Sequence, residues 1–435
     1  AEMAEASSPD VYPNAVAYSA VLNAWAKSRE PGAAKRAEKI LIHMEKMYKN
    51  GNENVKPNAV SYSTVIAAFA KDGKALEAEQ VLQRLQDVYE ATGDTELRPN
   101  IVSFTSVIDA WSKSRARGAA QRAEAILQRT HQLAEEWGDT DLIPGCVSFT
   151  AVLDAWAKSS EKYAAKRAEN ILQQMQDLYE KGNVEVKPNV RSYTSVLDCL
   201  AKSNERDATA RAEAILERMQ RLHQEGDEEV RPDTVAFSAM LNAYARNARS
   251  NPKAPEKAEA LLQTMADLYK GGDIRVKPNR HSYTTVMSAW SRSGSKEAPK
   301  RIQSIIRNMK ELASSGEAQL EPHTYQYNVL LSAYAKIGNA KKAEAVLERM
   351  EIEASRGNDD VRPDTISFNT VIDAYSKSRD RSAAEKAESI LSRMQNQYVG
   401  GNLKVKPDVF TFTSVISALS KSREASAAEK AMEYL

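Results

Sequence analysis

The hydrophobic residues of this chain recur in two alternating patterns, and both predict α-helices. In the first, apolar residues stand at i, i+3, i+4 and i+7, as in Tyr18, Val21, Leu22 and Trp25. This spacing places them on one stripe of a helix. The second pattern, such as AAKRAEKILIHMEKMYK at 33–49, consists mostly of strong helix formers. A turn rich in Gly, Asn and Asp follows, and then a proline with Asn or Asp after it, which ends one helix and caps the next.

These predicted helix pairs repeat along the chain. Ten prolines mark the repeats at intervals of 41 to 46 residues: Pro13, Pro57, Pro99, Pro144, Pro188, Pro232, Pro278, Pro322, Pro363 and Pro407. We therefore divide the chain into an N-terminal remnant, 1–12, and an array over 13–435 of nine complete repeats and a truncated tenth. One helix pair cannot bury its apolar stripe alone, so the pairs are expected to stack. The predicted fold is all-α, an α-solenoid superhelix with a long concave surface.

Composition excludes several classes of protein. Among the 435 residues, 42% are hydrophobic and 27% are charged, which excludes a wholly disordered chain. No apolar run reaches 18 residues, so no membrane partner is expected. Two cysteines and five scattered histidines argue against a disulfide framework and against a metal site. The chain begins without methionine and stops partway through a repeat, so we expect a mature or trimmed segment.

The usual catalytic motifs are missing from the sequence. It contains no GxGxxG, no Walker lysine loop, no HExxH and no GxSxG. We therefore expect no enzymatic activity, no catalytic residues, no cofactor and no small-molecule substrate. The formal net charge of +1 argues against a polycationic nucleic-acid coat. It leaves room for a local basic stripe, because electrostatic fields are local within a Debye length of roughly 10 Å.

One face of the first helix has a composition that core packing does not explain. We number each repeat from the second residue after its proline. Positions 2, 5, 9 and 13 then cluster within 80° on the side opposite the apolar stripe, at 100° per residue. Position 5 is small and hydrogen-bonding in every repeat: Ser19, Ser63, Thr105, Thr150, Thr194, Ser238, Thr284, Asn328, Asn369 and Thr413. Position 13 is always basic: Lys27, Lys71, Lys113, Lys158, Lys202, Arg246, Arg292, Lys336, Lys377 and Lys421.

Position 2 is mostly aliphatic, although it is expected on the exposed face. Its residues are Val16, Val60, Val102, Val147, Arg191, Val235, His281, Tyr325, Ile366 and Phe410. Structural explanations exist for single positions, since a lysine suits a helix C-terminus and a serine or threonine suits a first turn. The three positions together indicate single-stranded nucleic acid: a base against the aliphatic group, its edge at the small polar residue, and its phosphate at the cation.

At this point the sequence resembles the pentatricopeptide repeat (PPR) family. PNVRSYTSVLDCLAKS from Pro188 and PDTISFNTVIDAYSKS from Pro363 are similar to the family's first helix. The second helix, with its Ala-Glu start and Met near its end, as from Ala343 to Met350, is similar as well. Family repeats are shorter, near 35 residues. Most repeats here insert about three residues between the helices and about six after the second helix.

The resemblance implies an RNA strand that runs parallel to the repeats with one base per repeat. In the family, position 5 and the residue after the next proline read the base, while position 2 sandwiches it. The implied pairs are Ser19 with Asn58, Ser63 with Asn100, Thr105 with Gly145, Thr150 with Asn189, Thr194 with Asp233, Ser238 with Asn279, Thr284 with His323, Asn328 with Asp364, and Asn369 with Asp408. The family's code would read them as A, A, unassigned, A, G, A, unassigned, U and U. Position 13 would bind phosphates.

Two functions are left open by the sequence. The first is sequence-selective binding of single-stranded RNA in organellar RNA metabolism, with the organelle, a mitochondrion or plastid, implied by the family resemblance alone. The second is a helical-repeat scaffold that binds a protein partner or forms part of a ribonucleoprotein such as an organellar ribosome. The near-neutral net charge favours the scaffold. The uniformly basic position 13 and the small polar position 5 favour RNA.

Overall fold

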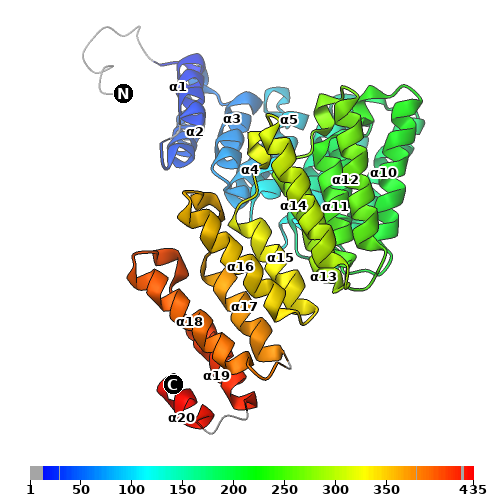
Figure 1. Ribbon diagram of the computed structural model, residues 1–435. Helices are drawn as coiled ribbons and strands as arrows, with labels where there is room; N and C mark the ends of the chain where they lie inside the picture. Colours follow the sequence, from blue (N-terminus) through cyan, green and yellow to red (C-terminus); the bar gives the residue numbers. More distant parts are fainter. Residues whose placement is uncertain (1–12, 29, 379, 423–425) are drawn as a thin grey trace. The chain divides into compact units, whose positions relative to one another are not determined.

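The computed structural model describes residues 13–28, 30–378, 380–422 and 426–435, and these form twenty α-helices in consecutive pairs (Figure 1). The N-terminal remnant, 1–12, lies outside the described residues. The first helices of the pairs are α1 (Ala15–Lys27), α3 (Ala59–Lys71), α5 (Ile101–Lys113), α7 (Cys146–Lys158), α9 (Val190–Lys202), α11 (Thr234–Asn247), α13 (Arg280–Ser293), α15 (Thr324–Lys336), α17 (Thr365–Lys377) and α19 (Val409–Lys421). The second helices are α2 (Ala33–Lys49), α4 (Ala75–Thr92), α6 (Ala119–Trp137), α8 (Ala164–Glu180), α10 (Ala208–Gln224), α12 (Ala254–Lys270), α14 (Ala298–Ser314), α16 (Ala340–Ser355), α18 (Ala383–Val399) and α20 (Ala427–Glu433).

The predicted all-α array of stacked helix pairs is confirmed. No strand occurs in the part of the chain that the structure describes. Among these helices, none is both long and apolar enough to cross a membrane. The first helices begin as the sequence predicts, because the residue after each proline is the N-cap; the Asn100 side chain, for example, accepts from the Ser103 backbone N–H at 3.0 Å.

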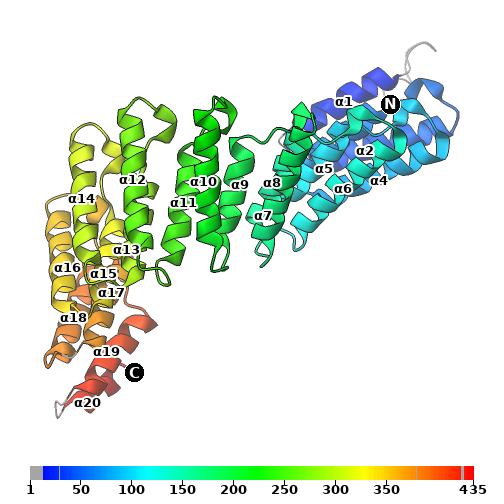
Figure 2. The same cartoon turned by 90° about the vertical axis from the view of Figure 1, so that its right-hand side faces the viewer.

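The packing divides the chain into two compact units. The first unit is Ala1–Ala208 with Glu217–Arg231, and the second is Thr209–Leu216 with Pro232–Leu435. Within the first unit, α3, α5, α7 and α9 pack side by side in that order, and each second helix from α2 to α8 also contacts the first helix of the next pair. The second unit repeats this arrangement from α11 to α19 (Figures 1 and 2). Each unit therefore has one row of first helices and one row of second helices.

A 3₁₀ helix of three residues lies between one pair and the next, in the stretch that lengthens most repeats. These helices are η2 (Glu53–Val55), η3 (Thr95–Leu97), η4 (Thr140–Leu142), η5 (Val184–Val186), η6 (Glu228–Val230), η7 (Ile274–Val276), η8 (Ala318–Leu320), η9 (Asp359–Val361) and η10 (Leu403–Val405). The last residue of each is a buried Val or Leu. The glycine before many of them has positive φ, as Gly182 does at 99°, which only glycine adopts without strain. The insertion thus adds one apolar side chain to the core at each junction.

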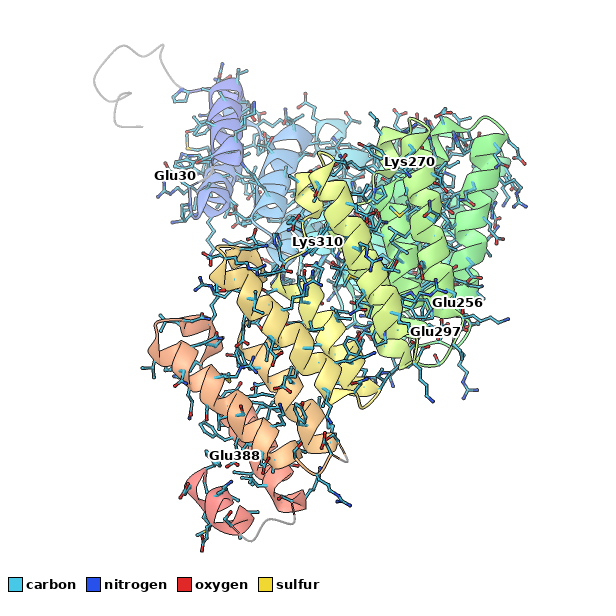
Figure 3. The ribbon with its side chains drawn as sticks, viewed as in Figure 1. Glu30, Glu256, Lys270, Glu297, Lys310 and Glu388 are labelled. Atoms are coloured by element: carbon cyan, nitrogen blue, oxygen red, sulfur yellow. The ribbon has the colours of Figure 1, made fainter. Side chains whose placement is uncertain are left out.

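Polar links also join neighbouring repeats. The Trp156 indole N–H of α7 donates to Glu124 Oε2 of α6 at 2.9 Å, and Trp290 of α13 donates to Glu259 of α12 at 3.0 Å. Figure 3 labels Lys310 and Glu388, two members of ion pairs between second helices; the Glu388 carboxylate of α18 lies 2.9 Å from Lys430 Nζ of α20. Such links fix the register between repeats as well as the spacing.

Candidate nucleic-acid interface

The row of first helices presents position 2 to solvent in every repeat. Its eight apolar members are between 55% and 74% exposed: Val16, Val60, Val102, Val147, Val235, Tyr325, Ile366 and Phe410. Arg191 and His281 are exposed as well. An apolar group at the same place on successive helices costs free energy in water unless a ligand covers it. This geometry suits the base-sandwiching role that the family resemblance assigns to position 2.

Position 5 is less exposed than the helical wheel predicts. Thr150, Thr284, Asn328 and Asn369 are buried, and only Thr413 of the last repeat is fully exposed. The expectation of an exposed position 5 is therefore wrong for these four residues. The cause is the neighbouring first helix, which packs over this side of the helix. Position 5 lies at the floor between two adjacent first helices, and position 2 lies at the rim.

Position 3 of the next repeat, which sequence reasoning missed, holds position 5 in place. The Ser63 and Ser103 hydroxyls lie 2.7 Å apart, the Thr105 and Ser148 hydroxyls also 2.7 Å apart, and those of Thr150 and Ser192 3.0 Å apart. Position 3 is fully buried in these repeats. A signal was present in the sequence, because position 3 is polar in eight repeats: Ser61, Ser103, Ser148, Ser192, Ser282, Gln326, Ser367 and Thr411.

In four repeats the two residues of the proposed reading pair are linked by hydrogen bonds, directly in two of them and through position 3 in the other two. Asn328 Nδ2 donates directly to Asp364 Oδ1 at 3.1 Å, and Asn369 Nδ2 donates to Asp408 Oδ1 at 3.1 Å. In repeats 2 and 4, Ser103 and Ser192 bridge the pair by also donating to the Asn100 and Asn189 side chains. Thr194 and Asp233 belong to different compact units.

The amide of Asn328 has one fixed orientation. Its Oδ1 accepts from the Ser367 hydroxyl at 2.6 Å, so its Nδ2 must face Asp364. Asp364 Oδ1 also caps α17 by accepting from the Ser367 backbone N–H at 2.9 Å. The second carboxylate oxygen, Oδ2, lies 3.3 Å from the Asn328 amide and has acceptor capacity left for an incoming N–H. The pair therefore presents a hydrogen-bond acceptor beside an amide.

Asp408 remains a carboxylate at neutral pH. Burial raises its pKa, but hydrogen bonds from the Thr411 backbone and hydroxyl and from the Asn369 amide outweigh burial, and its pKa is lowered overall. An ionised carboxylate only accepts hydrogen bonds. Repeat 9 thus matches a base edge that offers an N–H.

The basic residues at position 13 are all exposed, and several of them also donate to a structural partner that the sequence did not indicate. Lys158 Nζ donates to the Ser112 carbonyl at 2.9 Å, Lys336 to that of Ser291 at 2.9 Å and Lys421 to that of Ser376 at 2.6 Å. These acceptors lie in the last turn of the preceding first helix, where backbone carbonyls lack helical partners. These three residues therefore cap the preceding first helix, a role that the dipole of their own helix does not predict.

Acidic residues at position 9 reduce the positive charge of this face. Asp109 lies 2.5 Å from Lys113, and Asp198 and Asp373 each lie 2.6 Å from the lysine four residues later, Lys202 and Lys377. In repeat 4, Asp154 instead pairs with Arg191, the position-2 residue of the next repeat. The cation row is therefore uneven along the array.

A groove of about 760 Å³ lies between α5 and α7, with Val102 and Val147 on its walls and Thr105 and Thr150 deeper inside. Cys146 borders it and accepts from Asn189 Nδ2 at 3.2 Å. No group of three or more metal-ligating side chains is found within the described residues.

Two family models match parts of this chain. The family model described as PPR repeat matches residues 60–88 and 327–353, and the model described as pentatricopeptide repeat domain matches 351–422. The crystal structure of the pentatricopeptide repeat protein PPR10 from maize is similar, with 17% identity over 98% of this chain and 73% of that chain and a TM-score of 0.25. No curated protein matches the chain significantly.

Proposed function

We propose, on the premise that this chain belongs to the pentatricopeptide repeat family, that it binds single-stranded RNA sequence-selectively with one base per repeat. The family is generally RNA-binding and typically non-enzymatic. One observation carries the proposal: position 2 is exposed on every first helix, and beside it lies a recessed position 5, which in repeats 8 and 9 forms a polar pair with the next N-cap. A base stacked between successive position-2 side chains would direct its hydrogen-bonding edge toward these pairs.

The hydrogen-bonding groups of the pairs support different bases in different repeats. The Asn328–Asp364 and Asn369–Asp408 pairs offer a carboxylate acceptor and an amide, which suits uracil with its N3–H donor between two carbonyl oxygens. The Thr150–Asn189 pair offers no carboxylate and suits adenine, as the family's code has it. The proposed order of bases is that of the code: A, A, unassigned, A, G, A, unassigned, U and U.

Exchange of one pair for another within the chain tests the proposal. Asn328→Thr with Asp364→Asn gives repeat 8 the pair of repeat 4, and asparagine still caps the helix. We expect the preference at one RNA position to change from U to A, by about 1–3 kcal/mol if the contacts are as strong as other bidentate base contacts. Selection from a random RNA pool on both proteins measures it. If the variant binds all RNA sequences more weakly by the same factor, the pair only positions the RNA backbone.

The cellular role is a further part of the proposal. The family resemblance supports action on a transcript in a mitochondrion or plastid, in its stability, processing or translation, without a membrane or a small-molecule substrate. The scaffold function has one observation in its favour, the balance of charge on this face, where three lysines at position 13 are paired with aspartates. A random pool from which the intact chain enriches no RNA would favour a protein or ribonucleoprotein partner.

A further inference from the structure

The 3₁₀ helix that ends a repeat lies against the start of that repeat's first helix. In repeat 8, the Thr324 hydroxyl donates to the carbonyl of Asp360, the middle residue of η9, at 3.1 Å. In repeat 9, the Thr365 hydroxyl donates to the carbonyl of Lys404, the middle residue of η10, also at 3.1 Å. The Asp360 side chain extends toward the N-cap of α15, and its Oδ2 lies 3.8 Å from His323 Nδ1. A middle residue therefore reaches the place of the second reading residue, the one after the proline.

Gly145 leaves this place without a side chain at repeat 3. It is the N-cap of α7, and a β-carbon added to it would lie 3.4 Å from the carbonyl oxygen of Glu185 and 3.9 Å from Glu185 Oε2. Glu185 is the middle residue of η5. Both residues line the groove of about 760 Å³ that Thr105, position 5 of repeat 3, also lines. The Glu185 carboxylate therefore lies next to the space that an Asn or Asp side chain occupies in most other repeats.

A lysine holds the carboxylate of the middle residue in two other repeats. Lys56 Nζ lies 2.9 Å from Oε2 of Glu96, the middle residue of η3. Lys187 Nζ lies 3.6 Å from Oε2 of Glu229, the middle residue of η6. Both lysines stand directly before the proline that begins their repeat. In these repeats the carboxylate is therefore engaged in an ion pair.

Glu185 has no such lysine. Ile143 stands before the proline of its repeat, and among the described residues Glu185 takes part in no ion pair. Glu185 is exposed, and both carboxylate oxygens keep their acceptor capacity. The sequence Ile143-Pro144-Gly145 thus lacks both the lysine and the capping side chain, and it leaves one unpaired carboxylate in the groove.

A carboxylate is complementary to guanine among the four bases. Its oxygens only accept hydrogen bonds, and guanine offers two adjacent donors, N1–H and N2–H, on its Watson–Crick edge. Uracil offers a single donor between two carbonyl oxygens, while adenine and cytosine place a ring acceptor next to their amino group. Thr105 lines the same groove and adds a hydroxyl, which can donate to the guanine O6 acceptor next to N1–H. The groove between α5 and α7 thus has the groups of a guanine site.

We propose that Glu185 reads the base at repeat 3 in place of Gly145, so that repeat 3 prefers guanine. This rests on the RNA-binding function proposed above, and it gives a base to a repeat that the family's code leaves unassigned. The reading group comes from the 3₁₀ helix of the following repeat, whereas the other reading groups come from first helices and their N-caps. At this repeat, the segment that lengthens the repeat contributes to recognition as well as to packing.

Substitution of the carboxylate in the full chain tests this. Glu185→Gln keeps the size of the side chain and replaces one acceptor oxygen with a donor group. The wild-type chain and the variant are measured against four RNAs that differ only at the base facing repeat 3. We expect the wild-type chain to bind the guanine RNA about 5- to 100-fold more tightly than the other three, as for other bidentate base contacts. The variant should lose most of this preference and bind the other three RNAs within about twofold of wild type, because no base contact is lost there.

Glu229→Gln is the matched control. It removes the same charge from the middle residue of η6, where Lys187 holds the carboxylate and Asn189 is present as the reading residue, so the base preference should not change. Ile143→Lys tests the site without touching Glu185: it supplies the missing lysine and should reduce the preference for guanine. Urea unfolding verifies that all three variants are folded.

The proposal is overturned if the wild-type chain shows no preference for guanine at repeat 3, or if Glu185→Gln retains that preference. It is also overturned if Glu185→Gln binds all four RNAs more tightly by the same factor, because the carboxylate would then only repel phosphates. A wild-type chain that binds no RNA, or that lacks the preference for U at repeats 8 and 9, would instead refute the proposed function.

Discussion

Single residues on the first-helix row have two roles each. Asp364 caps α17 through Oδ1, and its Oδ2 lies beside the Asn328 amide, where the proposed function places a base edge. Asn328 is held by Ser367 so that its amide meets that carboxylate. Under the proposed function, recognition and local folding depend on the same atoms. In the proposed function, the side chain at position 3 fixes the orientation of the position-5 amide in the preceding repeat. Position 3 would therefore contribute to the base preference of the preceding repeat.

Removal of the Ser367 hydroxyl should therefore affect both stability and specificity. In Ser367→Ala, Asn328 Oδ1 loses its buried donor, and we expect the free energy of unfolding to fall by about 1–3 kcal/mol. The amide can then flip, so the preference for U at repeat 8 should weaken. Urea unfolding and binding to RNAs with each base at that position measure the two effects. Ser367→Thr is the control, because repeat 10 uses Thr411 in the same role; equal base discrimination in the alanine variant would contradict this account.

At the scale of elements, the 3₁₀ helices explain why these repeats are longer than those of the family. Each carries one aliphatic side chain into the core, as Val186 does, which is completely buried, while Val184 of the same helix is 71% exposed. Each 3₁₀ helix packs between consecutive helix pairs, and position 2 on the first helices is exposed in every repeat. The lengthened repeat is thus compatible with one base per repeat.

Two valines of η5 allow this packing to be measured. Val186→Ala should lower the free energy of unfolding by about 2 kcal/mol, because two buried methyl groups are lost and a cavity is left. Val184→Ala removes the same atoms from an exposed site and should change stability by less than about 0.5 kcal/mol. Chemical denaturation of both variants provides the measurement. Equal effects would mean that η5 does not contribute to the core.

The lysine caps at position 13 can be separated from phosphate binding. Lys158→Met removes a cation that donates to the Ser112 carbonyl, and we expect a loss of about 0.3–1 kcal/mol in unfolding free energy. If Lys158 also contacts a phosphate, the slope of log K against log salt should become less negative by about 0.7. Titrations of RNA at several salt concentrations measure this slope. An unchanged slope in a destabilised variant would leave Lys158 with the capping role alone.

The sequence predicted those features that depend on one helix, and it missed those that depend on two. The periodicity of residues such as Tyr18, Val21 and Leu22 determines a stripe, and the proline followed by Asn or Asp marks each helix start, so the helix pairs and the exposure of position 2 were predictable. A helical wheel describes one helix alone and does not show which of its faces a neighbouring helix covers. It therefore could not show that Thr150 and Asn369 are covered, or that the acceptor of Lys158 lies in the preceding repeat.

At the scale of the whole molecule, each compact unit is held together by contacts between adjacent repeats. Along one edge, the basic residue before a proline pairs with an acidic residue near the next 3₁₀ helix. Lys56 lies 2.6 Å from Asp94, Lys187 3.0 Å from Asp227, and Lys277 2.7 Å from Glu317. Stability in such an array is approximately a sum of repeat and neighbour contributions. Loss of the contacts at one junction therefore destabilises the repeats on both sides of it.

These edge pairs make stability depend on acid pH. The hydrogen bond from Lys56 lowers the pKa of Asp94 below its ordinary 3.8, and that from Lys277 lowers the pKa of Glu317 below 4.5. A depressed carboxyl pKa stabilises the folded state above the unfolded-state value, and this stabilisation is lost as pH falls through the folded-state value. Lys56→Met should therefore lower the urea midpoint at pH 7, and its effect should shrink as the pH falls below the ordinary carboxyl pKa of 3.8. A difference that is independent of pH would contradict the pairing.

The capping role of the last residue in each repeat restricts how such a protein can change its target during evolution. A new residue at this position must still serve as the N-cap of the next helix. Substitutions there are therefore confined largely to asparagine, aspartate, serine, threonine and glycine. Gly145, which has no side chain to cap with, and His323 are the departures in this chain. New targets are then reached more readily by duplicating or deleting whole repeats, or by changing position 5, than by free variation at the helix start.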